Sequence, residues 1–242
     1  MAPVESGIVQ LEQVAFRYRR RAPWVLRDVT LTVPRGRVIE VNGANGAGKS
    51  TLLRLLAGIV PPVSGRVSGR PARVGYAPER FPAAQPFTAR AYLAHLARVR
   101  GVPFADPAGW AERLGLAGSL DTRLPDLSKG DAHKTGLVQA LLASPELLVL
   151  DEPFAGLDTE TRTALPALLD ELAREGASVI VSDHQGDLRE LPGIVRWQVA
   201  GHTVTAGDLP EEYTVVEVTV RADEADELVT RLTTDGYRAR RR

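Results

Sequence analysis

The chain has 242 residues, of which 44% are hydrophobic, so it can form one large domain or one domain with an appendage. Lys and Arg number 30, as do Asp and Glu, and this zero net charge argues against a protein that binds nucleic acid over its whole surface. The absence of cysteine excludes disulfides, thiolate metal sites and a cysteine nucleophile. The stretch MAPVESGIVQ lacks a signal-peptide pattern, and no run of about 18 apolar residues predicts a membrane span.

The first third of the chain favours strands around one helix. Alternating or short apolar runs predict strands at 8–18, 26–33, 38–41 and 72–78. Residues 50–58 have a helical period and end at Gly58, which is typical of a helix C-terminus. The stretch 61–69 is rich in turn-forming residues, so we expect a turn there.

The remainder alternates helices with buried strands. The pattern is helical from 88 to 143, and Thr88 and Gly101 bound its first helix. Buried strands are expected at 147–151 and 177–183, and a helix at 159–176, which Pro166 should kink or reset. This alternation predicts an open, mostly parallel sheet.

The sequence GANGAGKS at 43–50 matches the phosphate-loop pattern G-x-x-x-x-G-K-[ST] in full, between a predicted strand and a helix. Lys49 can reach the outer phosphates, and the Ser50 hydroxyl can bind Mg²⁺. A plain glycine-rich turn is the alternative, which the full match and its context disfavour. The residues expected to bind the nucleotide are Asn42, Gly43, Ala44, Asn45, Gly46, Ala47, Gly48, Lys49, Ser50 and Thr51.

A second motif, LLVLDEP, ends a predicted buried strand in two carboxylates. Asp151 is suited to hold Mg²⁺ through water, and Glu152 to polarise an attacking water. Two solvated acids at a strand end would be the plainer interpretation of these residues. The phosphate loop upstream makes the catalytic interpretation the better one.

Two single residues depend on this context. His184 follows a predicted strand; such a histidine is more often structural, but beside a γ-phosphate it is a candidate donor. Tyr18 lies 25 residues before the phosphate loop and can stack on a base, or it can be an ordinary strand-face aromatic. Stacking does not separate ATP from GTP, although the Asn-Lys-x-Asp sequence of GTPases is absent.

Taken together, Tyr18, GANGAGKST, VGYAPE, DLSKGD, LLVLDEPFAGLD and VSDH resemble the motifs of the nucleotide-binding subunit of an ABC transporter, in their order and spacing, from about Val9 to Gly207. The resemblance implies a P-loop α/β fold of ABC type: a mostly parallel sheet core, an antiparallel β subdomain and a helical subdomain at about 83–143. It also implies an ATPase that uses ATP and Mg²⁺.

The resemblance further implies that LSKGD is the family's signature loop, which binds the γ-phosphate of ATP held by a second subunit. Ser128 could simply cap the following helix, and both roles can use the same helix end. Asp158 would lie at the dimer interface. The residues of the signature loop are Leu127, Ser128, Lys129, Gly130 and Asp131.

Three positions depart from the family pattern. Lys129 replaces a glycine and adds a positive charge. Asp131 replaces a glutamine and brings a negative charge to the signature. Glu79 replaces the usual glutamine that binds Mg²⁺; a carboxylate can still bind the ion, and its presence favours the exporter type.

The predicted domains are an ABC-type ATPase at 1–210 and a small α/β appendage at 211–242, with a strand at 214–220, a helix at 223–236 and a basic end, RARRR. The predicted function is to drive a membrane transporter, more often export than import, by ATP-dependent dimer closure. The expected partners are a membrane permease and a second nucleotide-binding subunit, without nucleic acid, and the expected location is the inner face of the cell membrane. A soluble ABC-type ATPase acting on nucleic acid or in cofactor assembly is the alternative.

Overall fold

The computed structural model describes residues 8–102, 107–183 and 185–207. The chain divides into two units, Met1–Leu209 and Pro210–Arg242, and all the described residues belong to the first. The predicted strand at 214–220, the helix at 223–236 and the basic end lie outside the described residues, so the appendage stays a prediction.

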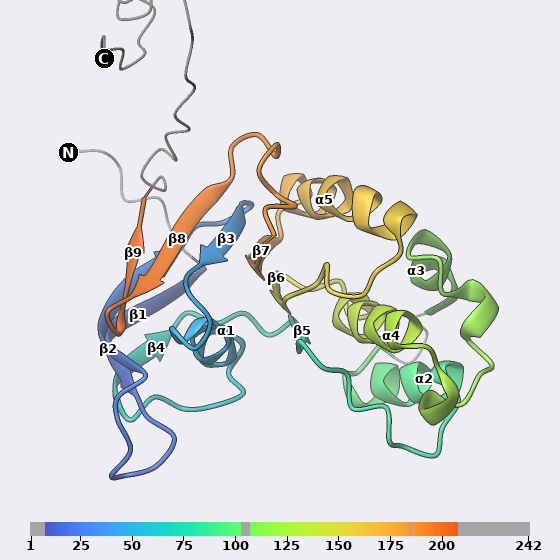
Figure 1. Ribbon diagram of the computed structural model, residues 1–242, viewed down its shortest axis with the longest axis horizontal. Coiled ribbons are helices and arrows are strands. Elements are labelled where there is room, and N and C mark those ends of the chain that lie inside the picture. The colour runs from blue at the N-terminus through green and yellow to red at the C-terminus, as the bar shows by residue number, and fades with distance from the viewer. Residues whose placement is uncertain (1–7, 103–106, 184, 208–242) are drawn as a thin grey trace, which may run out of the picture. The chain divides into compact units, whose positions relative to one another are not determined.

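The first unit begins with three strands, after which helices and strands are interspersed (Figure 1). The strands are β1 (Val9–Phe16), β2 (Leu26–Val33), β3 (Val38–Asn42), β4 (Ser64–Ser68), β5 (Val74–Ala77), β6 (Leu147–Asp151), β7 (Ser178–Ser182), β8 (Val195–Ala200) and β9 (Thr203–Ala206). The helices are α1 (Lys49–Ala57), α2 (Ala89–Val99), α3 (Pro107–Arg113), α4 (Lys129–Leu141) and α5 (Thr159–Arg174). No helix among these residues is both long and apolar enough to cross a membrane.

The strands form two sheets. The larger has the order β5-β6-β7-β3-β8-β9, in which only the β8–β9 pair is antiparallel. The smaller has the order β2-β1-β4 and is antiparallel throughout. This confirms the predicted α/β fold with a mostly parallel core and an antiparallel β subdomain.

Both faces of the larger sheet are buried, and strand β6 shows how. Its residues alternate between two cores: Leu148 and Leu150 pack with the helices α2 to α5, whereas Leu147 and Val149 pack with α1 and the antiparallel sheet. Successive side chains of a strand point to opposite faces, so a continuous apolar run serves both cores. Burial on both faces therefore fixes the position of β6 and of Asp151 at its carboxyl end.

The helices follow the sequence pattern with one difference. Thr88 caps α2 by accepting a hydrogen bond from the Ala91 amide, and Gly101, at φ 72°, follows the end of that helix, as predicted. A single helix α5 runs through Pro166, so the helix is not reset there.

Three strands differ from the expectation. The stretch 61–69, expected to be a turn, contains β4, which pairs with the free edge of β1. Its residues are mostly exposed, so burial gives no period-2 signal there. Strands β8 and β9 form a hairpin that the sequence analysis did not identify; β8 lies beside β3 and continues the parallel order.

Candidate functional site

The phosphate loop lies between β3 and the N-terminus of α1. Lys49 is buried at 7% exposure, and its Nζ donates a hydrogen bond to the Gly43 carbonyl at 2.8 Å. Gly43 has a φ of 151°, and a Cβ there would lie 2.5 Å from the carbonyl oxygen of Val199 in β8. Only glycine tolerates this approach, so the unpredicted strand β8 helps to fix the first turn of the loop.

The Ser50 hydroxyl and the Asp151 carboxylate meet across the end of the sheet. Ser50 Oγ donates to Asp151 Oδ1 at 3.1 Å, and Ser182 Oγ donates to the same oxygen at 2.9 Å. Asp151 Oδ2 is buried and has no hydrogen-bond partner among the described residues. A buried carboxylate oxygen beside a hydroxyl is a ligand set that suits a hard divalent cation.

The backbone of Glu152 is in the left-handed region, with φ at 55°. Its amide donates to Ser182 Oγ at 2.9 Å, so Ser182 holds both carboxylate residues that end β6. Ser182 is not among the predicted site residues, because its contacts depend on the strand register that pairs it with Asp151. Its position as the last polar residue of a buried strand beside β6 was the available signal.

At the signature, Ser128 caps α4. Its hydroxyl accepts from the Asp131 amide at 3.0 Å and donates to Asp131 Oδ2 at 2.9 Å. Ser119 Oγ also donates to Asp131 Oδ2, at 3.2 Å. The acidic residue that departs from the family pattern is therefore held by two hydroxyl groups rather than left unpaired.

The loop after Glu152 packs against the start of α4. A Cβ at Gly130 would lie 2.9 Å from the Gly156 carbonyl oxygen, so the two backbones approach closely. Lys134 Nζ forms an ion pair with Asp158 Oδ2 at 2.5 Å. This lysine, together with the Thr161 amide, holds the pKa of the Asp158 carboxyl well below its usual range, and Asp158 in turn caps α5.

Tyr18 lies beside α1, with its side chain exposed. The Tyr18 hydroxyl is 2.9 Å from Thr51 Oγ1 and accepts from Arg54 at 3.0 Å. The Tyr18 ring also packs edge-on against Phe16, with centroids 5.0 Å apart. The structure thus brings Tyr18 to the same helix end as Lys49 and Ser50.

Two predicted site residues are not joined to this group. The Glu79 side chain is half exposed and lies 3.9 Å from Arg80 Nε. His184 lies outside the described residues. The residue before it, Asp183, is buried and accepts from the amides of Gln185 and Asp187.

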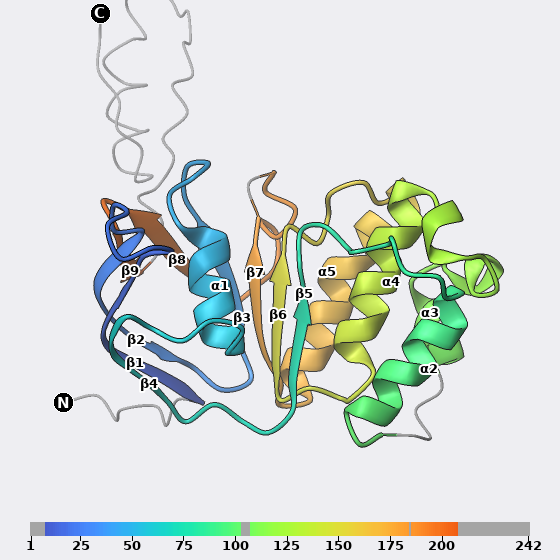
Figure 2. The same ribbon diagram turned by 90° about the horizontal axis from the view of Figure 1, so that it is seen from below.

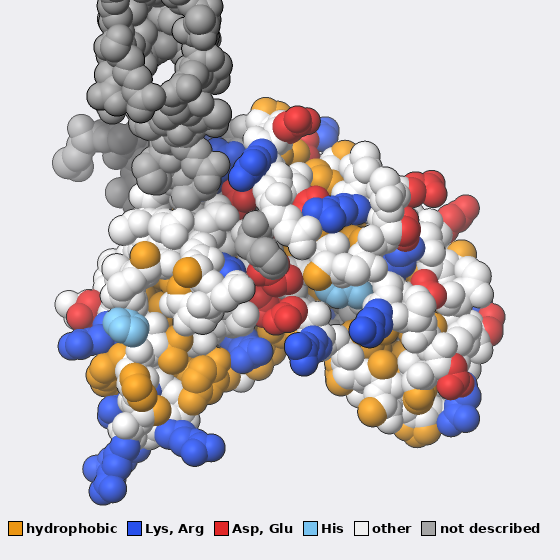
Figure 3. All heavy atoms as spheres, viewed as in Figure 1, with side chains coloured by type: hydrophobic (Ala, Val, Ile, Leu, Met, Phe, Trp, Pro, Cys, Tyr) orange, Lys and Arg blue, Asp and Glu red, His pale blue; other side chains and the backbone are white. Residues whose placement is uncertain are grey.

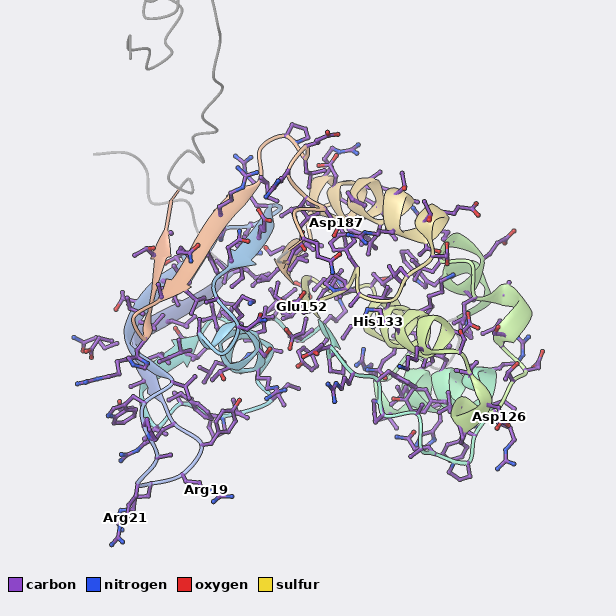
Figure 4. All side chains as sticks on the ribbon, in the orientation of Figure 1. Arg19, Arg21, Asp126, His133, Glu152 and Asp187 are labelled. Carbon is purple, nitrogen blue, oxygen red and sulfur yellow. The ribbon has the colours of Figure 1, made fainter. Side chains whose placement is uncertain are left out.

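The N-termini of α1 and α4 lie on the same side of the molecule (Figure 2), and the two helices pack against opposite faces of the larger sheet. Figure 3 shows this side, with acidic side chains gathered at its centre and basic ones around them. Figure 4 places Glu152 at that centre and His133 next to it, on the α4 side. The phosphate-loop motif, the carboxylates at and after the end of β6 and the start of α4 therefore lie on one side of the molecule.

Comparison with known proteins identifies relatives over most of the chain. The family model described as ABC transporter matches residues 26–155. The zinc import ATP-binding protein ZnuC of Cereibacter sphaeroides is 42% identical over 170 residues, 69% of each chain. The protein of the same name from Halorhodospira halophila is 38% identical over 191 residues, which cover 76% of this chain and 70% of that one.

A solved structure supports the same relationship. An ATP-binding subunit of an ABC transporter superposes with a TM-score of 0.74 at 27% identity. The match covers 83% of this chain and 89% of the other.

Proposed function

This chain belongs to the ABC transporter family of ATP-binding subunits. We propose that it powers the import of a divalent metal ion through a membrane permease, and that this ion is zinc. The observation that carries the proposal is the name shared by the two relatives, both zinc import proteins at 38–42% identity. The subunit would act at the inner face of the cell membrane, bound to that permease.

The chain is an ATPase and binds ATP with Mg²⁺. Ser50 and Asp151 fit the ion, because the Ser50 hydroxyl and Asp151 Oδ2, which has no hydrogen-bond partner among the described residues, supply the oxygens that Mg²⁺ prefers. The ion would offset the charge of the phosphates. Lys49 would then exchange the Gly43 carbonyl for a phosphate oxygen.

Glu152 is proposed as the general base that polarises the attacking water. Tyr18 is proposed to stack on the adenine ring of ATP. The signature loop is proposed to complete the ATP site of a second subunit. In support, the phosphate loop and the signature face the same side, but their helices pack on opposite faces of the larger sheet (Figure 2). Asp158, His184 and Glu79 keep the roles given from the resemblance, as predictions.

Export, the direction expected from Glu79, is not supported, because the relatives are named for import. The departure from glutamine at this position is thus no guide to the direction of transport. The alternative of a soluble ATPase acting on nucleic acid or in cofactor assembly is set aside, because the family match is to transporters.

The proposal is tested by uptake of radioactive zinc in cells that lack this chain. Uptake from zinc-poor medium should fall, return with the wild-type chain and stay low with Lys49→Ala, which separates ATP use from the mere presence of the protein. An excess of manganese, iron or nickel then tests the choice of ion. Zinc accumulation above the wild-type level would indicate export, and unchanged uptake would exclude zinc as the cargo.

A further inference from the structure

His133 is a buried histidine that no role described above uses. It lies in the second turn of α4, five residues after Ser128, and is 9% exposed. Its Nε2 is 3.0 Å from the carbonyl oxygen of Pro153, the residue after Glu152. One side chain therefore links α4 to the segment after β6.

The bond to Pro153 demands a donor on the side chain. The Pro153 carbonyl only accepts, and burial lowers the pKa of the His133 ring, which favours its neutral form. A neutral imidazole carries one N–H, which at Nε2 can donate to this carbonyl. A glutamine amide also offers N–H donors on a side chain of similar reach, and this makes it the natural conservative substitute.

The residue before Pro153, Glu152, has a strained backbone conformation that its surroundings must hold in place. Glu152 is held at φ 55°, a conformation that a residue with a side chain adopts only when its surroundings fix it. The Glu152 amide is fixed by Ser182 Oγ on one side, and the Pro153 carbonyl by His133 Nε2 on the other. The two contacts bracket this strained residue, from β7 and from α4.

We propose that His133 is a positioning residue for ATP hydrolysis, which holds the Glu152 backbone in its left-handed conformation through the Pro153 carbonyl. His133 would not touch the nucleotide. The proposal rests on the proposed role of Glu152 as the base. It adds that the helix that begins at the signature sets the position of that base within its own chain.

The first test compares His133→Gln with His133→Met in the purified chain. The two side chains have similar length and volume, but only glutamine can donate to the Pro153 carbonyl. We expect His133→Met to lower kcat on the order of 10–100-fold, as for a misplaced catalytic group. The KM for ATP should stay within about twofold, because the phosphate loop is unchanged. His133→Gln should retain most of the wild-type kcat.

His95→Ala is the matched control, because His95 is an exposed histidine of α2 that stacks on Phe87 and makes no contact with the site. It should leave kcat unchanged. Equal kcat values for His133→Gln and His133→Met would overturn the proposal, as would a loss that follows thermal stability in all three variants.

The second test asks whether His133 acts through Glu152. In a Glu152→Gln background, His133→Met should cause little further loss of the residual rate, because the group it positions is already gone. A loss as large as in the wild-type background would show that His133 acts elsewhere. If Glu152→Gln alone hydrolyses ATP normally, the proposed base is wrong, and that failure is separate from the result of the Gln and Met comparison.

Discussion

The N-termini of α1 and α4 face the same side of the molecule, but they differ in how their free backbone amide groups are capped. The cap of α1 is Gly48, which makes no side-chain hydrogen bond, and the first turn has no acidic residue. The cap of α4 is Ser128, which already accepts from the Asp131 amide, and the first turn contains the Asp131 carboxylate. A helix end without a cap leaves its N–H groups and its partial positive charge for a ligand.

Under the proposed function, this difference would separate a primary phosphate site at α1 from a secondary one at α4. The α1 end has no side-chain cap, whereas at the α4 end Ser128 already caps the Asp131 amide. In the proposed dimer, Ser128 would have to exchange Asp131 for the γ-phosphate of the other subunit. ATP should therefore bind first at α1, and the signature should add affinity only when two chains meet.

The largest effect is expected from Glu152→Gln, which should trap the state in which both helix ends contact one nucleotide. Loss of a positioned base should slow ATP turnover about 10²–10⁴-fold. Binding should be kept, because neither helix end is altered, and a sizing column run with ATP should show a dimer. Unchanged turnover would mean that Glu152 is not the base. Slow turnover without any dimer would count against the proposed role of α4.

Lys49→Ala should abolish phosphate binding at the N-terminus of α1. Each charge-assisted contact that Lys49 makes to a phosphate is worth about 1.5–3 kcal/mol, so ATP affinity and turnover should both collapse. Lys129→Ala is the matched control at the first position of α4, and it should weaken nucleotide binding by one isolated chain far less. Titration with a fluorescent ATP analogue measures both. Equal losses would remove the distinction between the two ends.

Mixing two inactive variants tests whether the α4 end serves the other subunit. A Lys49→Ala chain and a Ser128→Arg chain should each be inactive alone. In their mixed dimer, one site pairs the intact phosphate loop of the second with the intact signature of the first, so part of the ATPase activity should return. Pull-down through two different tags shows that the mixed dimer exists. A mixed dimer without activity would place both motifs in the same site.

The sequence predicts the α1 end of the site better than the rest. Residues 43–50 form one contiguous motif, and the apolar runs at 38–41 and 147–151 gave strands β3 and β6 nearly to the residue. These features are local, so propensity and period identify them.

What the sequence did not predict depends on contacts between distant segments. Ser182 acts through the strand register that sets it opposite Asp151, and β4 forms because β1 offers a free edge. The two hydroxyl groups on Asp131 come from Ser119 and Ser128, and only the nearer was a candidate from the motif. The left-handed backbone of Glu152 likewise comes from its surroundings.

The smallest effect is expected from Asp131→Gln, which sharpens the comparison by making the α4 end more like the family pattern. The change removes a carboxylate that repels phosphate and frees the Ser128 and Ser119 hydroxyls that now donate to it. It also removes a negative charge from the first turn of a helix, which should cost about 0.3–1 kcal/mol of folding stability. Stability and function should therefore move in opposite directions.

In a Glu152→Gln background, the concentration of chain needed for half dimerisation with ATP should fall by a few-fold, on the order of the same 0.3–1 kcal/mol. Thermal unfolding and a dilution series on a sizing column measure the two. If Asp131→Gln weakens the dimer, then the pairing of Asp131 with the two serines supports the signature, and the α4 end is prepared for phosphate by its own carboxylate rather than competing with it.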